Sequence, residues 1–378
     1  MSDRHEPPRS ALSSPNGLGT AADGVVLLWW GGCERASPPG RRHTMSTRTK
    51  LRFDLQRTAW MLLMLLPLLG SCHRQPSVVI AVIPRTSGVL MWEPEHGGAL
   101  ATALPQGADI YWNAPTREDD IQGQIALVDR VASRSYQGLV LSPDHALALI
   151  TPVRRAIARG LPTVVLGSPL AMPAGNGLWY VLNDEQTGAR MAAQRLTAML
   201  GGKGSIAVLG INPDITGIVE RARLFEGDLA QSAPEIRVVV NRSGSFNLPH
   251  EQQVAEETLR EHPEIDVIVT MTATAMHSAL AAIAASPEKH IRVIAFDPDS
   301  LTFDSPNLDS MIFENTRRMG TEAVQLLLAE HRGISQPAVT YVEPVLVTRE
   351  NIHTDEVTQL TSMDWRPARM RWKWSVGP

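Results

Sequence analysis

Short apolar runs rich in β-branched residues alternate with stretches of helical period from Ser77 onward. This alternation is typical of β-α-β units, in which buried parallel strands are covered by helices. Two stretches, 118–135 and 185–200, carry apolar residues on one side at the spacing of a helix that faces a sheet. The pattern therefore predicts an α/β fold with parallel sheets flanked by helices. The expected strands are 78–83, 108–112, 138–141, 163–166, 177–182, 205–209, 236–241, 267–271 and 292–296.

The segment before this alternation has the order of an export signal. From Met45 a basic stretch precedes the apolar run 59–69, which is shorter than the roughly 20 residues that a membrane-spanning helix needs. The run ends in Leu-Gly-Ser-Cys, the pattern of a lipoprotein signal in which Cys72 accepts the lipid. We therefore expect a signal peptide over 45–71 and an exported protein anchored to a bacterial membrane, facing the periplasm or the exterior. The alternative is a buried cysteine that ends an apolar helix.

The two ends of the chain lie outside the alternating pattern. Residues 1–44 are rich in Pro, Gly and Ser, and we interpret them as an upstream translation artefact or a disordered extension. Residues 72–76 would then be the anchor and a short linker. Residues 353–378 form a basic, Trp-rich tail. The tail could touch lipid headgroups near the anchor, or it could be a strap on the domain surface or a loose terminus.

Composition narrows the classes of partner. The 378 residues are 43% hydrophobic and 20% charged, which is a normal globular balance. The net charge of −4 argues against a nucleic-acid partner, because phosphate binding needs a basic surface. Both cysteines, Cys33 and Cys72, precede the alternating region, so no disulfide is expected to hold the fold. Small-molecule or protein partners are favoured.

No pattern typical of an enzyme, a cofactor site or a metal site stands out. The stretch Gly-Gly-Lys-Gly at 201–204 lacks the spacing of a phosphate-binding loop and precedes a strand, so it is interpreted as a helix end. Glu93, Glu95 and His96 are close together, but Pro94 interrupts the spacing of a zinc pair, and a solvated loop is expected there. We therefore expect a binding protein without a cofactor or a bound metal.

Several segments together resemble the periplasmic sugar-binding proteins of the ribose and galactose type, whose fold is shared by the effector domain of the lactose-repressor family. The resemblance extends over nearly all of 77–352, and its specificity comes from the order and spacing of the segments. They are IAVIP at 80–84, TREDDIQGQIALVDR at 116–130, YQGLVLSPD at 136–144, ARGLPTVVL at 158–166, VLNDEQTGARMAAQRL at 181–196, HPEIDVIV at 262–269, IRVIAFD at 291–297 and VTRENI at 347–352.

The resemblance implies two α/β lobes joined by three chain crossings, with a solute held in the cleft between them. By this analogy one lobe is 77–172 plus 298–335, and the other is 173–297 plus 336–352. It further implies a monomer that delivers a sugar or polyol to the permease of an ABC transporter. The alternative is a lipoprotein that signals to a membrane sensor kinase, and a carbohydrate-modifying enzyme is a weaker one. A repressor would carry a helix-turn-helix before Ser77, where the chain has an apolar leader instead.

Candidate ligand-binding residues follow from the carboxyl ends of the strands, where open parallel sheets bind their ligands. The resemblance adds an aromatic at Trp92 that would stack on a sugar face, and a core position is the alternative. It adds Arg221, whose guanidinium suits vicinal hydroxyls or a carboxylate, and Asp297, for which the alternative is a turn before a proline. The candidates are Ser87, Trp92, Arg117, Ser142, Asp144, Arg221, Thr272, Asp297 and Glu314.

Departures from the resembled pattern bear on the identity of the solute. Gly167-Ser168 stands where ribose-type proteins have an aspartate, and Thr272 stands where they have an asparagine. Leu224 replaces a glycine close to Arg221, and Glu314 replaces a glutamine. The absence of that aspartate and of that asparagine argues against ribose or glucose, and the expected ligand is another sugar, a polyol or a sugar-like metabolite.

Overall fold

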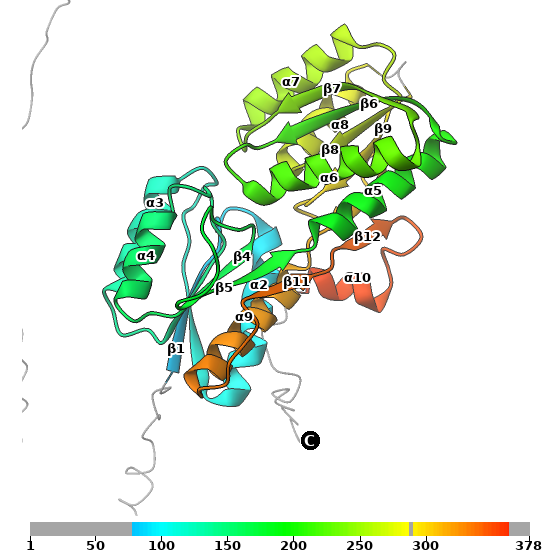
Figure 1. Cartoon of the computed structure of the whole chain (residues 1–378). Helices are drawn as coiled ribbons and strands as arrows, with labels where there is room; N and C mark the ends of the chain where they lie inside the picture. Colours follow the sequence, from blue (N-terminus) through cyan, green and yellow to red (C-terminus); the bar gives the residue numbers. More distant parts are fainter. Residues whose placement is uncertain (1–77, 287–289, 363–378) are drawn as a thin grey trace, which may run out of the picture. The chain divides into compact units, whose positions relative to one another are not determined.

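The computed structural model describes residues 78–286 and 290–362, and these belong to one compact unit, Arg74–Pro378. Their strands form two separate six-stranded sheets, shown in Figure 1. All neighbouring strands run parallel except β10 (Leu308–Phe313) and β12 (Val345–Thr348), which pair antiparallel. The first sheet, from edge to edge, is β11 (Val339–Val342), β5 (Leu178–Asn183), β4 (Thr163–Gly167), β3 (Gly138–Leu141), β1 (Val78–Ile83) and β2 (Ala108–Trp112). The second is β12, β10, β9 (Arg292–Phe296), β8 (Val267–Thr270), β6 (Lys203–Ile211) and β7 (Glu235–Ser243).

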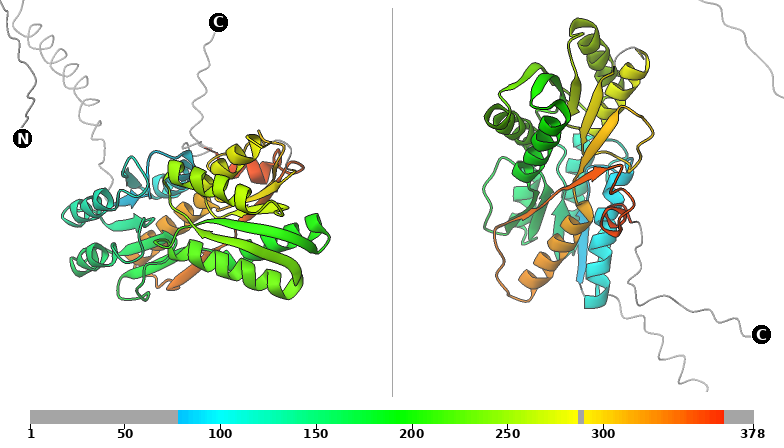
Figure 2. Two further views of the ribbon diagram at one scale, coloured as in Figure 1. Left: turned by 90° about the horizontal axis from the view of Figure 1, so that it is seen from above. Right: turned by 90° about the vertical axis from the view of Figure 1, so that its right-hand side faces the viewer.

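Helices cover both faces of each sheet, because every strand in the middle of a sheet is apolar on both sides. Figure 2 shows these layers from two further directions. The first lobe has α3 (Ile121–Ala132) and α4 (Ile150–Ala158) on one face, and α2 (Glu93–Ala103) and α9 (Thr316–His331) on the other. The second lobe has α5 (Glu185–Leu200) and α6 (Thr216–Ser232) on one face, and α7 (Leu248–Glu261), α8 (Ala273–Ala284) and the short α10 (Asp355–Leu360) on the other. Single 3-10 turns precede and follow α2, at Leu90–Trp92 and Leu104–Gln106.

The predicted α/β fold with two sheets is confirmed, and all nine predicted strands are present with ends within two residues of the expected ones. Helix α5 has the predicted bounds, and α3 lies inside the predicted 118–135. Strands β10, β11 and β12 were not predicted. The last two are sheet edges of four residues whose side chains are mostly half-buried, so they lack the continuous apolar run that marks a central strand.

The chain crosses between the lobes three times, but each crossing lies further along than expected. The boundary predicted at 172 is wrong because β5 still pairs with β4, and the first crossing follows Asn183. The boundary at 297 is wrong because β10 still pairs with β9 in the second sheet. The boundary at 335 is wrong because β11 completes the first sheet, so only Glu343 and Pro344 separate it from β12. In each case one more strand is hydrogen-bonded to the sheet before the chain leaves it.

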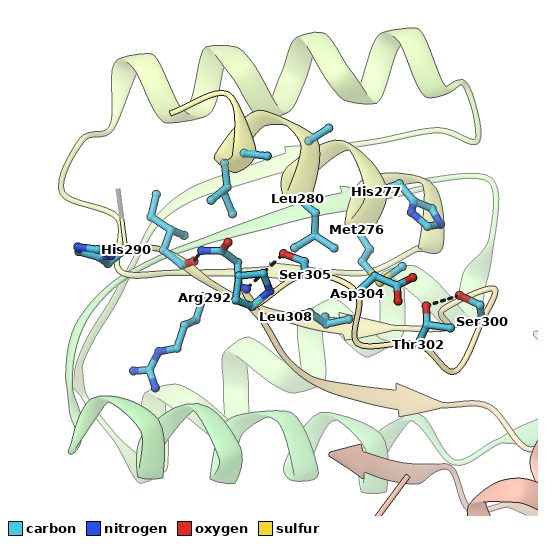
Figure 3. A pocket seen from close by; sticks show the side chains of 16 residues that line it. Met276, His277, Leu280, His290, Arg292, Ser300, Thr302, Asp304, Ser305 and Leu308 are labelled. Atoms are coloured by element: carbon cyan, nitrogen blue, oxygen red, sulfur yellow. Dashed lines mark hydrogen bonds between the residues drawn. The ribbon is translucent and has the colours of Figure 1, made fainter. Parts of the chain in front are cut away.

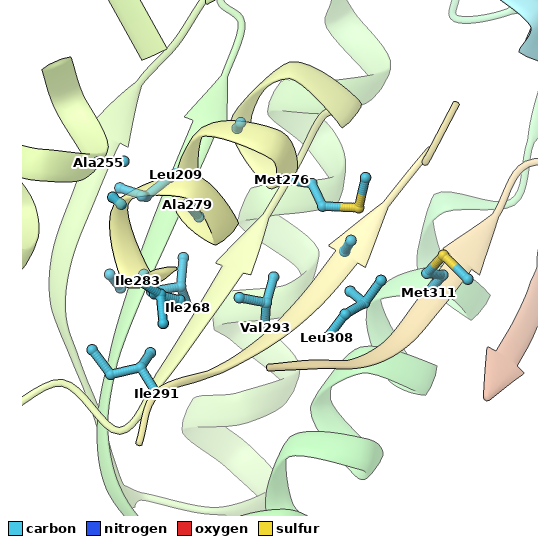
Figure 4. Packing of buried hydrophobic residues seen from close by; sticks show 14 of the residues in the cluster. Leu209, Ala255, Ile268, Met276, Ala279, Ile283, Ile291, Val293, Leu308 and Met311 are labelled. Carbon is cyan, nitrogen blue, oxygen red and sulfur yellow. The ribbon is translucent and has the colours of Figure 1, made fainter. Parts of the chain in front are cut away.

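The core of the second lobe extends beyond the predicted end of the domain at 352. Figure 4 shows side chains of α8 packed on residues of β8, β9 and β10, among them Ile268, Val293 and Met311. Val357 and Leu360 of α10 belong to the same buried cluster. The first part of the predicted tail is therefore a helix of the domain. Cys72 and the tryptophans at 365–374 lie outside the described residues.

Helices α2 and α9 cross at two glycines. A Cβ atom on Gly98 would lie 2.0 Å from the carbonyl oxygen of Arg317, and one on Gly320 would lie 2.2 Å from that of Glu95. Only glycine allows the two backbones to approach so closely. The contact holds the first turn of α2 against α9, and this places Glu95 in the interior beside the carboxyl ends of β1 and β3. Among the described residues, no helix has the length and apolar character needed to cross a membrane.

Candidate binding cleft

A cavity of about 240 Å³, lined by both charged and apolar side chains, lies where the carboxyl ends of the two sets of strands face each other. Its walls come from both lobes, which suits a solute that is enclosed when the lobes close. The lining residues are Arg85, Val89, Met91, Glu118, Ile218, Phe246, Leu248, Thr272, Ala273, Thr274, His277, Asp297 and Asp299.

Direct hydrogen bonds join the lobes beside this cavity. The backbone N–H of Ala146, after β3, donates to the carbonyl oxygen of Asp214 at 2.9 Å. The backbone N–H of Gly217, in the first turn of α6, donates to Ser168 Oγ, after β4, at 2.7 Å. His145 Nε2 also lies 3.5 Å from a carboxylate oxygen of Asp214. The structure is therefore a closed arrangement of the two lobes.

Arg85, the second residue after β1, is the cation of the first lobe's wall. Its guanidinium lies 5.0 Å from the ring centroid of Trp92 and 5.4 Å from that of Phe246, which belongs to the other lobe. Its Nε lies 3.7 Å from a carboxylate oxygen of Asp144 and has no hydrogen-bond partner, although Arg85 is only 9% exposed. A buried donor without a partner in the wall of a cavity is suited to receive a ligand atom.

Behind Arg85 lies a layer of buried acids held by α2 and α3. Ser142 Oγ donates to Glu95 Oε2 at 3.1 Å, while Glu95 Oε1 and both carboxylate oxygens of Asp144 have no hydrogen-bond partner. Gln124 of α3 fixes the loop after β3, because its amide donates to the Ser142 carbonyl oxygen at 2.8 Å and accepts from the Asp144 N–H at 2.9 Å. Burial raises the pKa of Glu95 to about 8 and that of Asp144 to about 7.

Arg221 of α6 is the centre of the second lobe's wall and is 2% exposed. It forms two hydrogen bonds with Glu185, of 2.6 and 2.9 Å, and one of 2.6 Å with Asp297. It also donates to the Met271 carbonyl oxygen at 3.3 Å. Glu314 lies in the same cluster, and burial followed by repulsion from Asp297 raises its pKa to about 8. With four of its donor hydrogens engaged, Arg221 mainly positions these carboxyl groups.

Two residues of the second lobe owe their place in the cavity to local backbone geometry. Thr272 caps α8, and its hydroxyl accepts from the Ala275 N–H at 3.2 Å. Asp297, directly after β9, has a φ of 46°, a left-handed conformation that aspartate tolerates better than most residues. Two residues later Asp299 binds His277 Nε2 at 2.9 Å, and this hydrogen bond raises the pKa of His277.

The predicted site residues divide into three groups. Thr272 and Asp297 line the cavity. Ser87 and Arg117 are exposed: Ser87 Oγ donates to the Pro115 carbonyl oxygen at 3.1 Å, and Arg117 lines a neighbouring surface depression. The remainder are buried in the layer around the cavity, namely Trp92, Ser142, Asp144, Arg221 and Glu314.

Sequence reasoning missed several residues of the wall. Arg85, Glu118 and Phe246 line the cavity but were not among the predicted residues. The solvated loop expected around Glu95 is wrong, because α2 begins at Glu93 and Glu95 is 1% exposed. Pro94 is compatible with the first turn of a helix, where its missing N–H costs nothing. The position of Pro94 could therefore have indicated, from the sequence alone, that a helix begins at Glu93.

A larger depression of about 1000 Å³, shown in Figure 3, lies in the second lobe between α8 and the chain before β10. Leu280 and Met276 of α8 point into it, and Ser300, Thr302 and Asp304 stand at its other side. It takes no wall from the first lobe, so closure of the lobes does not enclose it. Across the described ranges, no group of three or more His, Cys, Asp or Glu side chains could hold a metal ion.

Comparison with known proteins agrees with this architecture. A D-apiose import binding protein of Paraburkholderia graminis is 23% identical over 255 residues, which cover 66% of this chain and 80% of the relative. A D-allose-binding periplasmic protein of Escherichia coli is 23% identical over 287 residues, covering 71% of this chain and 91% of the relative.

A solved structure shares the fold: an ABC transporter solute-binding protein of Agrobacterium vitis with bound α-D-tagatopyranose. It superposes with a TM-score of 0.69 at 21% identity, covering 75% of this chain and 99% of the other. The family model of the periplasmic binding protein domain matches residues 80–334. This match confirms the interpretation as a binding protein, and the chain belongs to the periplasmic binding protein domain family.

Proposed function

We propose that this protein captures a sugar or sugar-like solute outside the cytoplasm and delivers it to the permease of an ABC transporter. The observation that carries the proposal is the cavity between the lobes, whose walls present charged and hydroxyl side chains from both sides. About 240 Å³ lies below the range of about 300–1,000 Å³ of pockets for drug-sized ligands, and it suits a single monosaccharide unit. The named relatives bind apiose and allose, which are of this size class.

The walls provide the hydrogen-bond donors and acceptors that a polyhydroxyl solute needs. Arg85 lines the cavity, and its Nε is a buried donor without a hydrogen-bond partner, 3.7 Å from a carboxylate oxygen of Asp144 in the layer behind it. Thr272 and Asp297 add a hydroxyl and a carboxylate from the other lobe. A solute that bonds to both walls binds the closed form better than the open one, and this difference in affinity drives closure.

A thermal-shift panel of aldoses, ketoses and polyols tests the proposal. A solute present at about a hundred times its dissociation constant should stabilise the protein by about 2.7 kcal/mol. Asp297→Asn should greatly reduce the shift, whereas the matched variant Asp304→Asn, in the larger depression, should preserve it. Loss of the shift in Asp304→Asn alone would place the solute in the depression of Figure 3 and refute the proposed cleft.

We further propose that the protein is a monomer tethered through a lipid on Cys72. Mass measurement of the mature N-terminus should find a diacylated cysteine, and Cys72→Ala should abolish the lipid while leaving the solute affinity unchanged. A mature N-terminus before Met45 would contradict the proposed signal peptide.

A further inference from the structure

Carboxylates of the two lobes face each other across the cavity. Glu118, which precedes α3, comes from the first lobe, and Asp297 and Asp299 come from the loop after β9 in the second. The pKa of Glu118 is raised, first by burial and also by the negative charges of its neighbour Asp119 and of Asp299 and Asp297. Like charges on opposing walls oppose closure of the lobes.

The charged side chains that line the cavity are three acids, Glu118, Asp297 and Asp299, and two groups that can carry positive charge, Arg85 and His277, the latter bonded to Asp299. Arg85 in the first lobe attracts five carboxyl groups, those of Glu95, Glu118, Asp119, Asp144 and Glu314. Arg221 in the second lobe is shared in the same way by three carboxyl groups, those of Glu185, Asp297 and Glu314. Among the described residues, no side chain forms a hydrogen bond with Glu118.

This imbalance is costly in a closed cavity, because a buried charge without a partner loses its hydration and gains nothing in return. A neutral sugar does not correct it, since hydroxyl groups donate hydrogen bonds but carry no charge. A protonated amine carries one positive charge and three donors in a compact group. Placed between Glu118 and the acids of the second lobe, it would turn repulsion between the walls into attraction.

A second observation concerns Arg85, a cation in the wall of the cavity whose Nε lies 3.7 Å from Asp144 in the layer behind it. Arg85 is nine-tenths buried, lines the cavity, and has an Nε without a hydrogen-bond partner. The guanidinium also lies close to both Trp92 and Phe246, so an acceptor group of a solute would meet a positioned donor. A solute with both hydroxyl and amino groups matches both features.

We propose that the solute is an amino sugar or amino polyol whose protonated amine lies between Glu118 of the first lobe and Asp297 and Asp299 of the second. This inference rests on the proposed function and specifies its substrate class. Glu118 is the specificity-determining residue, because among the described residues it is the acid of the cavity lining that no cation holds by a hydrogen bond, whereas Asp297 is bonded to Arg221 and Asp299 to His277.

Isothermal titration with matched solutes tests the inference. Each set has a neutral hexose, its 2-amino form and the neutral N-acetyl form, for D-glucose, D-galactose and D-mannose. In at least one set the amino form should bind ten times or more tighter than both neutral forms. Glu118→Gln should reduce this ratio to below threefold, and Glu235→Gln, an exposed acid at the start of β7, should leave it unchanged.

The outcomes separate the two proposals. If a neutral hexose binds at least as tightly as its amino form in every set that binds, the amine is refuted while the proposed sugar-binding function stands. If the ratio persists in Glu118→Gln, the assigned position of the amine is wrong. If no member of the sets and no solute of the thermal-shift panel binds, both proposals fail.

Discussion

Glu314 offers a direct test of how burial controls the charges of the cleft. It follows β10, is 6% exposed, and lies against β4, since a Cβ atom on Gly167 would come within 2.8 Å of its Oε1. Burial, then repulsion from Asp297, raises its pKa from 4.5 to about 8, and the attraction of Arg221 does not compensate. Replacement by the isosteric glutamine removes the titration without changing the volume of the side chain.

The sign of the effect follows from linkage. Because the folded state binds the proton of Glu314 more tightly than the unfolded state, the stability that this proton contributes is lost as pH rises from 4.5 through about 8. Between pH 5 and pH 9 the loss is on the order of 4 kcal/mol. Glu314→Gln should therefore gain about this much stability relative to the wild type as pH rises over this interval.

Urea unfolding at pH 5, 7 and 9 measures the difference. Other titrating groups are common to both proteins, so the difference between them reports Glu314 together with the neighbours whose pKa it influences, and the exposed Glu235→Gln serves as the control for loss of one carboxylate. The unfolding free energy of Glu314→Gln minus that of the wild type should rise steadily from pH 5 to pH 9. A difference that stays constant or falls over this range would refute the assignment of a raised pKa to Glu314.

Three further predictions test the fold and the closed state. Truncation after residue 352 should destabilise the protein by roughly 2 kcal/mol or more for each of the two core side chains of α10, whereas truncation after 362 should preserve the melting temperature. Gly320→Ala should cost about 1–3 kcal/mol in urea unfolding, because its Cβ would strike the backbone of α2. Ser168→Ala should remove the bond from Gly217 and weaken solute affinity about fivefold by titration, the equivalent of about 1 kcal/mol; unchanged affinity would mean that this bond does not hold the lobes closed.

The central strands could be predicted because a strand buried on both faces must be apolar throughout, as in β1 and β3. The site was harder, because a position at a strand's end does not fix where the side chain points. Arg85 and Ser87 follow the same strand, yet Arg85 enters the cavity while Ser87 bonds to the loop after β2. Glu95 was missed for a related reason: whether a polar residue near a helix start is exposed depends on what packs against it. Here that partner is α9, more than two hundred residues later in the chain.

The same distance along the chain has a consequence for the order of folding. Strand β11 pairs with β5, and α9 covers one face of the first sheet, to which β1 belongs. The first lobe is therefore completed by residues 316–342. While the chain emerges from the ribosome, its first lobe lacks an edge strand and one covering helix until nearly the whole sequence has been made. The second lobe also requires β12 and α10, so neither lobe can complete its fold until nearly the end of synthesis.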